Sequence, residues 1–192
     1  MENSKSKTLI INLYGGPGTG KSTMAAAVFF EMKARGLQVE LVREFVKDWA
    51  WEGRKIKHNE QIYIFAKQAY RESIFYGKVD FVVTDSPLFL SEVYEEHYFG
   101  TANLTHGLYK KWLEANCNEM ESINFFLSRP YKYQKDGRYE SEEEAKLIDS
   151  KIKIALEAQS IKYTDFNSVK GEKKIVDEIL AIRKIECFDS NI

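Results

Sequence analysis

Eight consecutive residues in the N-terminal part of the sequence have the types and the spacing that polyphosphate binding requires. The segment Gly15-Gly16-Pro17-Gly18-Thr19-Gly20-Lys21-Ser22 matches the P-loop pattern G-x-x-x-x-G-K-[ST] at each fixed position. Its glycines allow a tight turn in which backbone N–H groups can surround phosphate oxygens. We expect Lys21 to reach the β- and γ-phosphates of ATP and the Ser22 hydroxyl to complete the coordination of Mg²⁺; an ordinary glycine-rich turn before a helix is the alternative. The predicted nucleotide-binding residues are Gly15, Gly16, Pro17, Gly18, Thr19, Gly20, Lys21, Ser22 and Thr23.

Two carboxylates follow short apolar runs that have the length of β-strands. Glu44 comes after the alternating segment 37–42, and Asp85 ends the apolar segment 80–85. Because ligands of a parallel sheet bind at the carboxyl ends of its strands, we expect both acids on the same edge as the P-loop. Asp85 could hold Mg²⁺ or act as the base for an incoming hydroxyl, and Glu44 could hold that hydroxyl or accept its proton. The alternatives are structural: Glu44 as a cap of a helix over 45–51, and Asp85 as the N-cap of the next helix.

A polar loop that carries several cations follows the strand expected over 122–128. Its basic residues are Arg129, Lys132, Lys135 and Arg138. A loop of this kind, here residues 129–141, could close over the triphosphate as a small lid. It would exclude water and place Arg129 or Arg138 on the charge that develops during phosphoryl transfer. An ordinary basic surface loop is the competing interpretation.

The elements that must position these residues alternate regularly along the chain. Strands are expected over 8–14, 37–42, 80–85, 122–128 and 160–164, and helices between and after them. For the helix over 59–77, the spacing of Ile62, Phe65, Ala66, Ala69 and Ser73 predicts the buried face. A capping box over 141–144 predicts the start of a later helix. This order predicts a three-layer α/β fold, a five-stranded parallel sheet with helices on both faces, within a single domain over residues 1–192.

The composition is that of a globular protein. The chain has 192 residues, of which 30% are charged and 44% hydrophobic, with a formal net charge of −1. These values argue against a disordered or strongly nucleic-acid-seeking chain, although a local basic groove stays possible. The sequence contains no long apolar run and no signal-peptide core, so we expect no membrane partner and a cytoplasmic location.

With these pieces placed, the chain resembles the P-loop nucleoside and nucleotide kinases, in particular NadR-type ribosylnicotinamide kinase domains and small phage-encoded ATPase/kinase proteins. The resemblance rests on the P-loop, the segments 42–48, 61–71 and 84–88, and Gly137-Arg138 of the lid. It implies a sheet order of 2-3-1-4-5 and phosphoryl transfer from ATP with Mg²⁺. It further implies that Lys21 and Ser22 hold phosphates and metal, and that Glu44 and Asp85 manage the acceptor and metal. Arg129 and Arg138 would serve the lid.

The expected activity is transfer of the γ-phosphoryl group of ATP to a hydroxyl of a nucleoside, a nucleotide or a modified base. Some phage proteins of this appearance are thought to phosphorylate a hydroxymethylated pyrimidine within DNA, so DNA carrying a modified base is a possible partner. Its phosphates could follow Arg54, Lys55, Lys57, Lys132 and Lys135. Trp49 and Trp51 could stack an acceptor base, although packing is the interpretation we favour. An NTPase switch without a small acceptor, and either a monomer or a homodimer, remain open alternatives.

Overall fold

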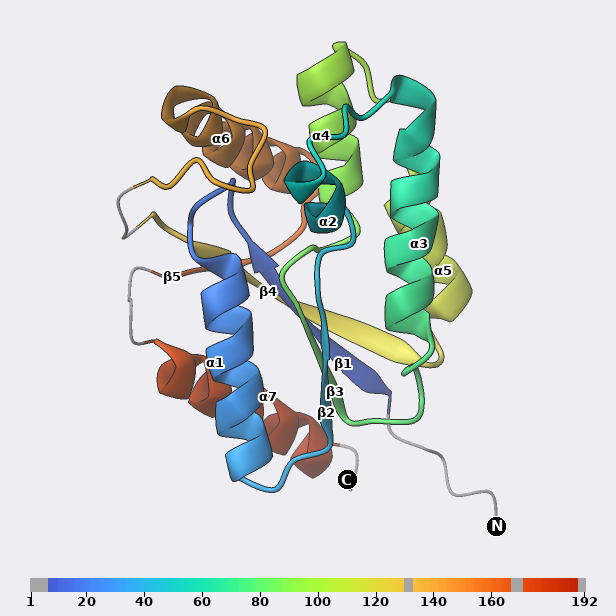
Figure 1. Cartoon of the computed structure of the whole chain (residues 1–192). Helices are drawn as coiled ribbons and strands as arrows, with labels where there is room; N and C mark the ends of the chain where they lie inside the picture. Colours follow the sequence, from blue (N-terminus) through green and yellow to red (C-terminus); the bar gives the residue numbers. More distant parts are fainter. Residues whose placement is uncertain (1–6, 130–132, 167–170, 190–192) are drawn as a thin grey trace.

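A central parallel β-sheet organises the computed structural model of the chain, which describes residues 7–129, 133–166 and 171–189, with side chains up to 183 (Figure 1). The five strands lie in the order β2-β3-β1-β4-β5, and all four neighbouring pairs are parallel. The expected order 2-3-1-4-5 is therefore confirmed. The strands are β1 (Thr8–Tyr14), β2 (Val39–Val42), β3 (Phe81–Thr84), β4 (Met120–Leu127) and β5 (Thr164–Phe166).

Strand β1 lies at the centre because all seven of its residues can be buried. Leu9, Ile11 and Leu13 point to one face of the sheet, and Ile10 and Tyr14 point to the other. A strand buried on both faces is typical of an α/β fold with helices on each side. Its carboxyl end leads directly into the P-loop.

Helices cover both faces of this sheet (Figure 1). Helices α1 and α7 pack on the face of Leu9, Ile11 and Leu13, whereas α3, α4, α5 and α6 pack on the opposite face. The helices are α1 (Lys21–Ala34), α2 (Lys47–Trp51), α3 (Gln61–Ser73), α4 (Leu90–Phe99), α5 (Leu108–Asn116), α6 (Glu142–Ala158) and α7 (Glu172–Asp189), with a 3₁₀ turn η1 (His58–Glu60) before α3. In the described part of the chain, no helix is long and apolar enough to cross a membrane.

The capping box predicted at the start of α6 is present. The Glu144 N–H donates to Ser141 Oγ (3.2 Å), and the Ser141 N–H donates to Glu144 Oε2 (2.7 Å). The two side chains thus satisfy two N–H groups that the helix itself leaves free. The start of α6 fixes the end of the loop that was predicted to be a lid.

Two expectations about individual elements are wrong. The fifth strand covers Thr164–Phe166 rather than 160–164, because the N–H groups of Ser160 and Ile161 still bond to carbonyls of α6, and Ser160 adopts a left-handed conformation (φ 55°). In α3, Ile62 and Ala66 are exposed. The side chains that α3 buries are Gln61, Phe65, Gln68, Ala69 and Glu72.

Polar residues therefore belong to the inner face of α3. Gln68 Oε1 accepts the N–H of Phe45 (3.1 Å), and Glu72 accepts the hydroxyl of Tyr76. Hydrophobic spacing alone cannot identify a face on which polar side chains have such partners, and this explains the error in the predicted face.

Candidate functional site

The P-loop connects β1 to α1 in a conformation that depends on its glycines. Gly15 and Gly18 have positive φ angles (140° and 81°), and a Cβ atom on Gly15 would lie 2.7 Å from Thr19 Oγ1. Lys21 Nζ donates to the carbonyls of Gly15 (2.7 Å) and Gly16 (3.0 Å), so the side chain folds back from the start of α1 onto the beginning of the P-loop. Burial lowers the pKa of this ammonium, and the charges of Glu44 and Asp85 partly oppose that effect.

The two predicted carboxylates meet beside Lys21. Asp85, which follows β3, is only 3% exposed, and its Oδ1 accepts the N–H of Glu44 (2.8 Å), which follows β2. Burial raises the pKa of the Glu44 carboxyl to about 7; the Lys21 charge lowers it and the Asp85 charge raises it further. Such a carboxyl changes protonation near neutral pH, as a general base requires.

Neither acid has the structural role of a helix cap that the sequence left as an alternative. Helix α2 has Val46 at its N-cap position, and α4 begins at Leu90 after a turn, so neither Glu44 nor Asp85 caps a helix. Asp85 instead orders the chain at Glu44 through a main-chain hydrogen bond. Positions after adjacent strands β2 and β3 thus bring the two acids together.

A cavity of about 380 Å³ is lined by the P-loop, by helices α2, α3 and α4, and by the lid. Lys21, Ser22 and Glu44 line one part of it, and Gln61 and Tyr94 line another. This volume falls in the range of small-molecule sites. The cavity therefore offers space for an organic molecule beside the phosphate-binding loop.

Gln61 is the most informative polar group in that second part. Its side chain is only 2% exposed, it lines the cavity, and no hydrogen bond to it occurs within the described residues. The Gln61 amide therefore has one acceptor and two donors free to bond to a molecule in the cavity. Tyr94 and Tyr98 of α4 line the same part, and Tyr98 donates its hydroxyl to the buried Glu140.

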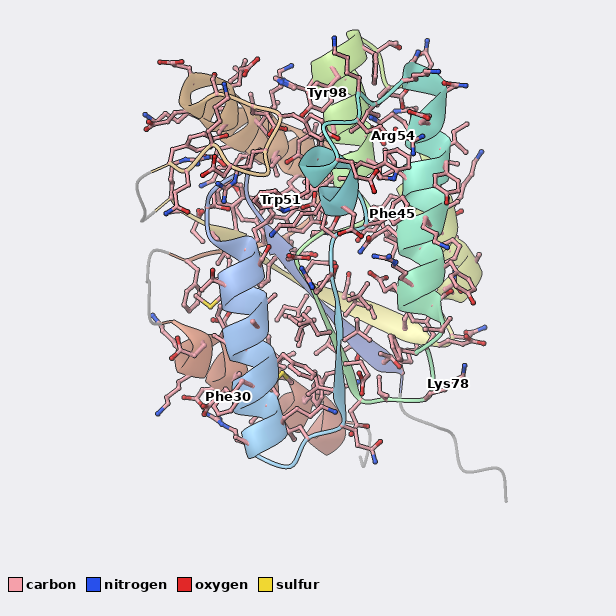
Figure 2. All side chains as sticks on the ribbon, in the orientation of Figure 1. Phe30, Phe45, Trp51, Arg54, Lys78 and Tyr98 are labelled. Atoms are coloured by element: carbon pink, nitrogen blue, oxygen red, sulfur yellow. The ribbon has the colours of Figure 1, made fainter. Side chains whose placement is uncertain are left out.

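The described part of the predicted lid closes one side of the cavity. Tyr133 packs against Gly18, since a Cβ on that glycine would lie 2.9 Å from the Tyr133 ring. Gly137 lies against the indole of Trp51, with 2.6 Å from an added Cβ to Trp51 Cε2. The Tyr139 hydroxyl donates to the carbonyl of Arg54 (2.7 Å). Figure 2 labels Trp51 at the end of α2 and Tyr98 on α4, and the lid contacts the first through Gly137 and the second through Glu140.

The predicted site residues divide into two groups. Those that line the cavity are Pro17, Gly18, Gly20, Lys21, Ser22, Thr23, Glu44 and Arg138. Those that lie outside its lining are Gly15, Gly16, Thr19, Asp85 and Arg129. Arg129 bonds instead to the Pro17 carbonyl and to Asp149. Residues 130–132 of the predicted lid, including Lys132, lie outside the described residues.

This geometry agrees with the comparison to known families. Residues 10–174 match the family model of an AAA domain, AAA_28. The chain belongs to this AAA-domain family. It is thus a P-loop NTPase domain, a class that binds nucleotide, generally with Mg²⁺. No curated protein matches the chain.

The residues of this AAA domain fit a magnesium-bound polyphosphate. Close to Lys21, the donor set consists of oxygen atoms only, from the exposed Ser22 hydroxyl and the carboxylates of Glu44 and Asp85, and Mg²⁺ prefers oxygen. Gly18 carries no side chain, and the Tyr133 ring and the Arg129 guanidinium lie where a Cβ on this residue would project. Lys21, Ser22 and Asp85 are the residues that would hold the phosphates and the ion.

Sequence reasoning missed several residues of the AAA domain site. Glu140 is 5% exposed, lines the cavity and adds negative charge near Glu44. Asp149 of α6 accepts the N–H of Gly16 across 133 positions of sequence. From the sequence, Gln61, Gln68 and Arg71 are polar positions of α3 of which one could face an acceptor ligand, and solvated side chains explain them equally well. None of these lies in a motif, so a single sequence carries no signal that separates them from ordinary surface residues.

Proposed function

We propose that this AAA domain is a kinase that transfers the γ-phosphoryl group of Mg-ATP to a hydroxyl of a nucleoside, nucleotide or modified base. The supporting observation is the continuity of one cavity. Lys21, Ser22 and Glu44 on the phosphate side and the amide of Gln61 on α3 all belong to the lining of this one cavity. Hydrolysis alone needs space for a water molecule, whereas this cavity has room for an organic acceptor.

Glu44 is the proposed base. The acceptor oxygen forms a bond to the γ-phosphorus while the bond from that phosphorus to the β–γ bridging oxygen breaks, and ADP leaves. The acceptor proton passes to the Glu44 carboxylate, whose pKa of about 7 allows it to accept a proton near neutral pH. Bound Mg²⁺ supplies charge neutralisation on the phosphates. Asp85 orders Glu44 through the main chain and lies near Lys21.

The remaining groups position the acceptor and exclude water. The Gln61 amide offers one acceptor and two donors to the polar edge of a base. Tyr94 and Leu90 provide apolar surface beside it, and Arg138 lines the cavity from the lid side. Holding two reactants in contact accounts for much of the rate of phosphoryl transfer, since little covalent work falls to the protein.

A transfer screen tests the proposal. Labelled ATP is offered with nucleosides, nucleoside monophosphates, and DNA that carries ordinary or hydroxymethylated pyrimidines. We expect label on one of these acceptor classes, and weaker transfer by Gln61→Ala at low acceptor concentration. Steady phosphate release with no labelled acceptor would overturn the kinase assignment and favour an NTPase switch.

A second candidate acceptor is the modified base within DNA. Exposed aromatic residues support it: Tyr63 (51%) and Tyr70 (62%) on α3, the helix whose Gln61 lines the cavity, and Trp51 (66%), which itself lines the cavity. Arg54, Lys55, Lys57 and Lys67 lie along the same stretch of chain, between residues 54 and 67. Bases stack on aromatic rings, and cations follow a phosphate backbone.

Salt dependence separates the two acceptors. Transfer to DNA should fall steeply as salt increases, because each neutralised phosphate releases a counterion. Transfer to a free nucleoside should change much less. Replacing Arg54 and Lys55 together by glutamine should reduce the salt slope for DNA, while an equal slope in both proteins would contradict this acceptor.

A further inference from the structure

Arg129 and Asp149 form an ion pair behind the P-loop. Arg129 is the second residue after β4, and Asp149 lies in the second turn of α6. One guanidinium nitrogen lies 2.7 Å from Asp149 Oδ2, and the side chains are 11% and 20% exposed. A pair this well shielded interacts more strongly than an ion pair at the open surface.

The pair is attached to two consecutive residues of the P-loop. Asp149 Oδ1 accepts the N–H of Gly16 (2.6 Å), and the other terminal nitrogen of Arg129 donates to the carbonyl of Pro17 (2.6 Å). A Cβ on Gly16 would lie 2.6 Å from Asp149 Oδ1 and 2.7 Å from the Ala145 carbonyl, so α6 approaches the loop closely.

Lys21 provides the second set of bonds. Its Nζ binds the carbonyls of Gly15 and Gly16, whereas Arg129 and Asp149 bind the Gly16 N–H and the Pro17 carbonyl. The first half of the loop is therefore fixed by side chains from three separate segments. Its backbone conformation decides where the later N–H groups point.

The geometry points to Arg129 and Asp149 as positioning residues that hold the P-loop in its nucleotide-binding shape. In this role Arg129 acts through the loop and does not touch the transferred phosphoryl group. It does not line the cavity, and its Nε is buried without a partner among the described residues, whereas Arg138 does line the cavity. The inference rests on nucleotide binding by the P-loop and not on the identity of the acceptor.

The charge of Asp149 makes it possible to distinguish a positioning role of Arg129 from direct contact with the transferred phosphoryl group. While Arg129 is present, the carboxylate is neutralised. Without Arg129, an unpaired and mostly buried carboxylate would remain against a loop that binds a polyanion, and like charges repel strongly at low local dielectric. Removing the charge of Asp149 as well should then restore part of the affinity for Mg-ATP.

The first experiment is a direct titration of the wild type, Arg129→Ala, Arg129→Ala/Asp149→Asn and Lys146→Ala with Mg-ATP. We expect Arg129→Ala to weaken binding about 10-fold or more, the energy of a charge-assisted hydrogen bond. The double variant should recover several-fold of that loss. Lys146→Ala, which removes an exposed pair with Glu142 on the same helix, should bind as the wild type does.

Kinetics give the second reading of the same proteins. A positioning role raises the KM for Mg-ATP more than it lowers kcat, and Arg129→Lys should rescue part of the effect. If Arg129 contacted the transferred phosphoryl group, kcat would fall most and Asp149→Asn would rescue nothing. No rescue in the double variant overturns the inference.

The third measurement uses the protein without nucleotide. Loss of the bond to Asp149 should speed exchange of the Gly16 amide hydrogen about 10-fold in Asp149→Ala and leave it unchanged in Lys146→Ala. Unchanged exchange in Asp149→Ala overturns the inference. A wild type that binds Mg-ATP but phosphorylates no acceptor would refute only the proposed kinase function.

Discussion

The two ends of the cavity are built in different ways. The phosphate end is one continuous stretch of backbone, in which β1, the P-loop and α1 follow each other and Lys21 folds back onto the loop. The acceptor end is assembled from side chains of α3, α4 and the lid, such as Gln61, Tyr94 and Gln134. A backbone-made site needs a fixed spacing of residues, whereas a side-chain-made site tolerates many sequences with the same shape. The first end therefore identifies the family, and under the proposed function the second end would set the specificity for the acceptor.

The strongest test of the phosphate end is Lys21→Ala. We expect turnover to fall about 100-fold or more, because a positioned cation on the transferred phosphates is lost. The fold should persist, as circular dichroism can show. Lys33→Ala is the matched control on the same helix, since Lys33 forms an exposed pair with Glu40 (3.3 Å) and a cation–π contact with Phe29, neither of which lines the cavity. Near-normal turnover in Lys21→Ala would remove this lysine from the mechanism.

Glu44 lies where the two ends meet, and its protonation provides a pH test. Only the ionised carboxylate accepts a proton, so kcat/KM should fall as the pH drops through about 7. Glu44→Gln should abolish this acidic limb and lower turnover about 100-fold, the lower part of the range for a general base. The measurement is the pH profile of transfer to the acceptor found in the screen.

Asp85→Asn serves as the control for that assignment. The Asp85 charge helps to raise the pKa of Glu44, so its removal should move the acidic limb to lower pH without abolishing it. If instead the limb disappears in Asp85→Asn and persists in Glu44→Gln, then Asp85 is the base.

The acceptor end should respond separately from the phosphate end. Gln61→Ala is expected to raise the KM for the acceptor about 10-fold, the energy of one or two hydrogen bonds, and to leave the affinity for Mg-ATP unchanged. Asn59→Ala, an exposed neighbour, is the control. A parallel loss of Mg-ATP affinity in Gln61→Ala would contradict the division into two ends.

The sequence predicted the phosphate end well for physical reasons. The order of strand, glycine loop and helix follows from local constraints, and the carboxylates after β2 and β3 follow from the rule that parallel strands share one functional edge. The acceptor end was not predictable in this way. Gln61 and Gln68 lie on the buried face of α3 because partners or the cavity compensate their polarity, and no spacing rule anticipates those partners. Asp149 meets Gly16 only after the chain has folded around β4 and α6.

The smallest predicted effect concerns the contact that joins the lid to the acceptor end. Gly137 has a positive φ (69°), and a Cβ there would lie 2.6 Å from the Trp51 ring, whereas Gly53 has nearly the same φ (65°) with nothing within 4 Å of an added Cβ. Alanine at either position carries a similar backbone cost of about 1 kcal/mol, which thermal unfolding can measure. Only Gly137→Ala should displace the indole and admit water, so phosphate release without acceptor should rise several-fold in that variant alone. Equal release in the two alanine variants would show that the Trp51 contact does not seal the cavity, and that the lid excludes water through Tyr133 and Tyr139 instead.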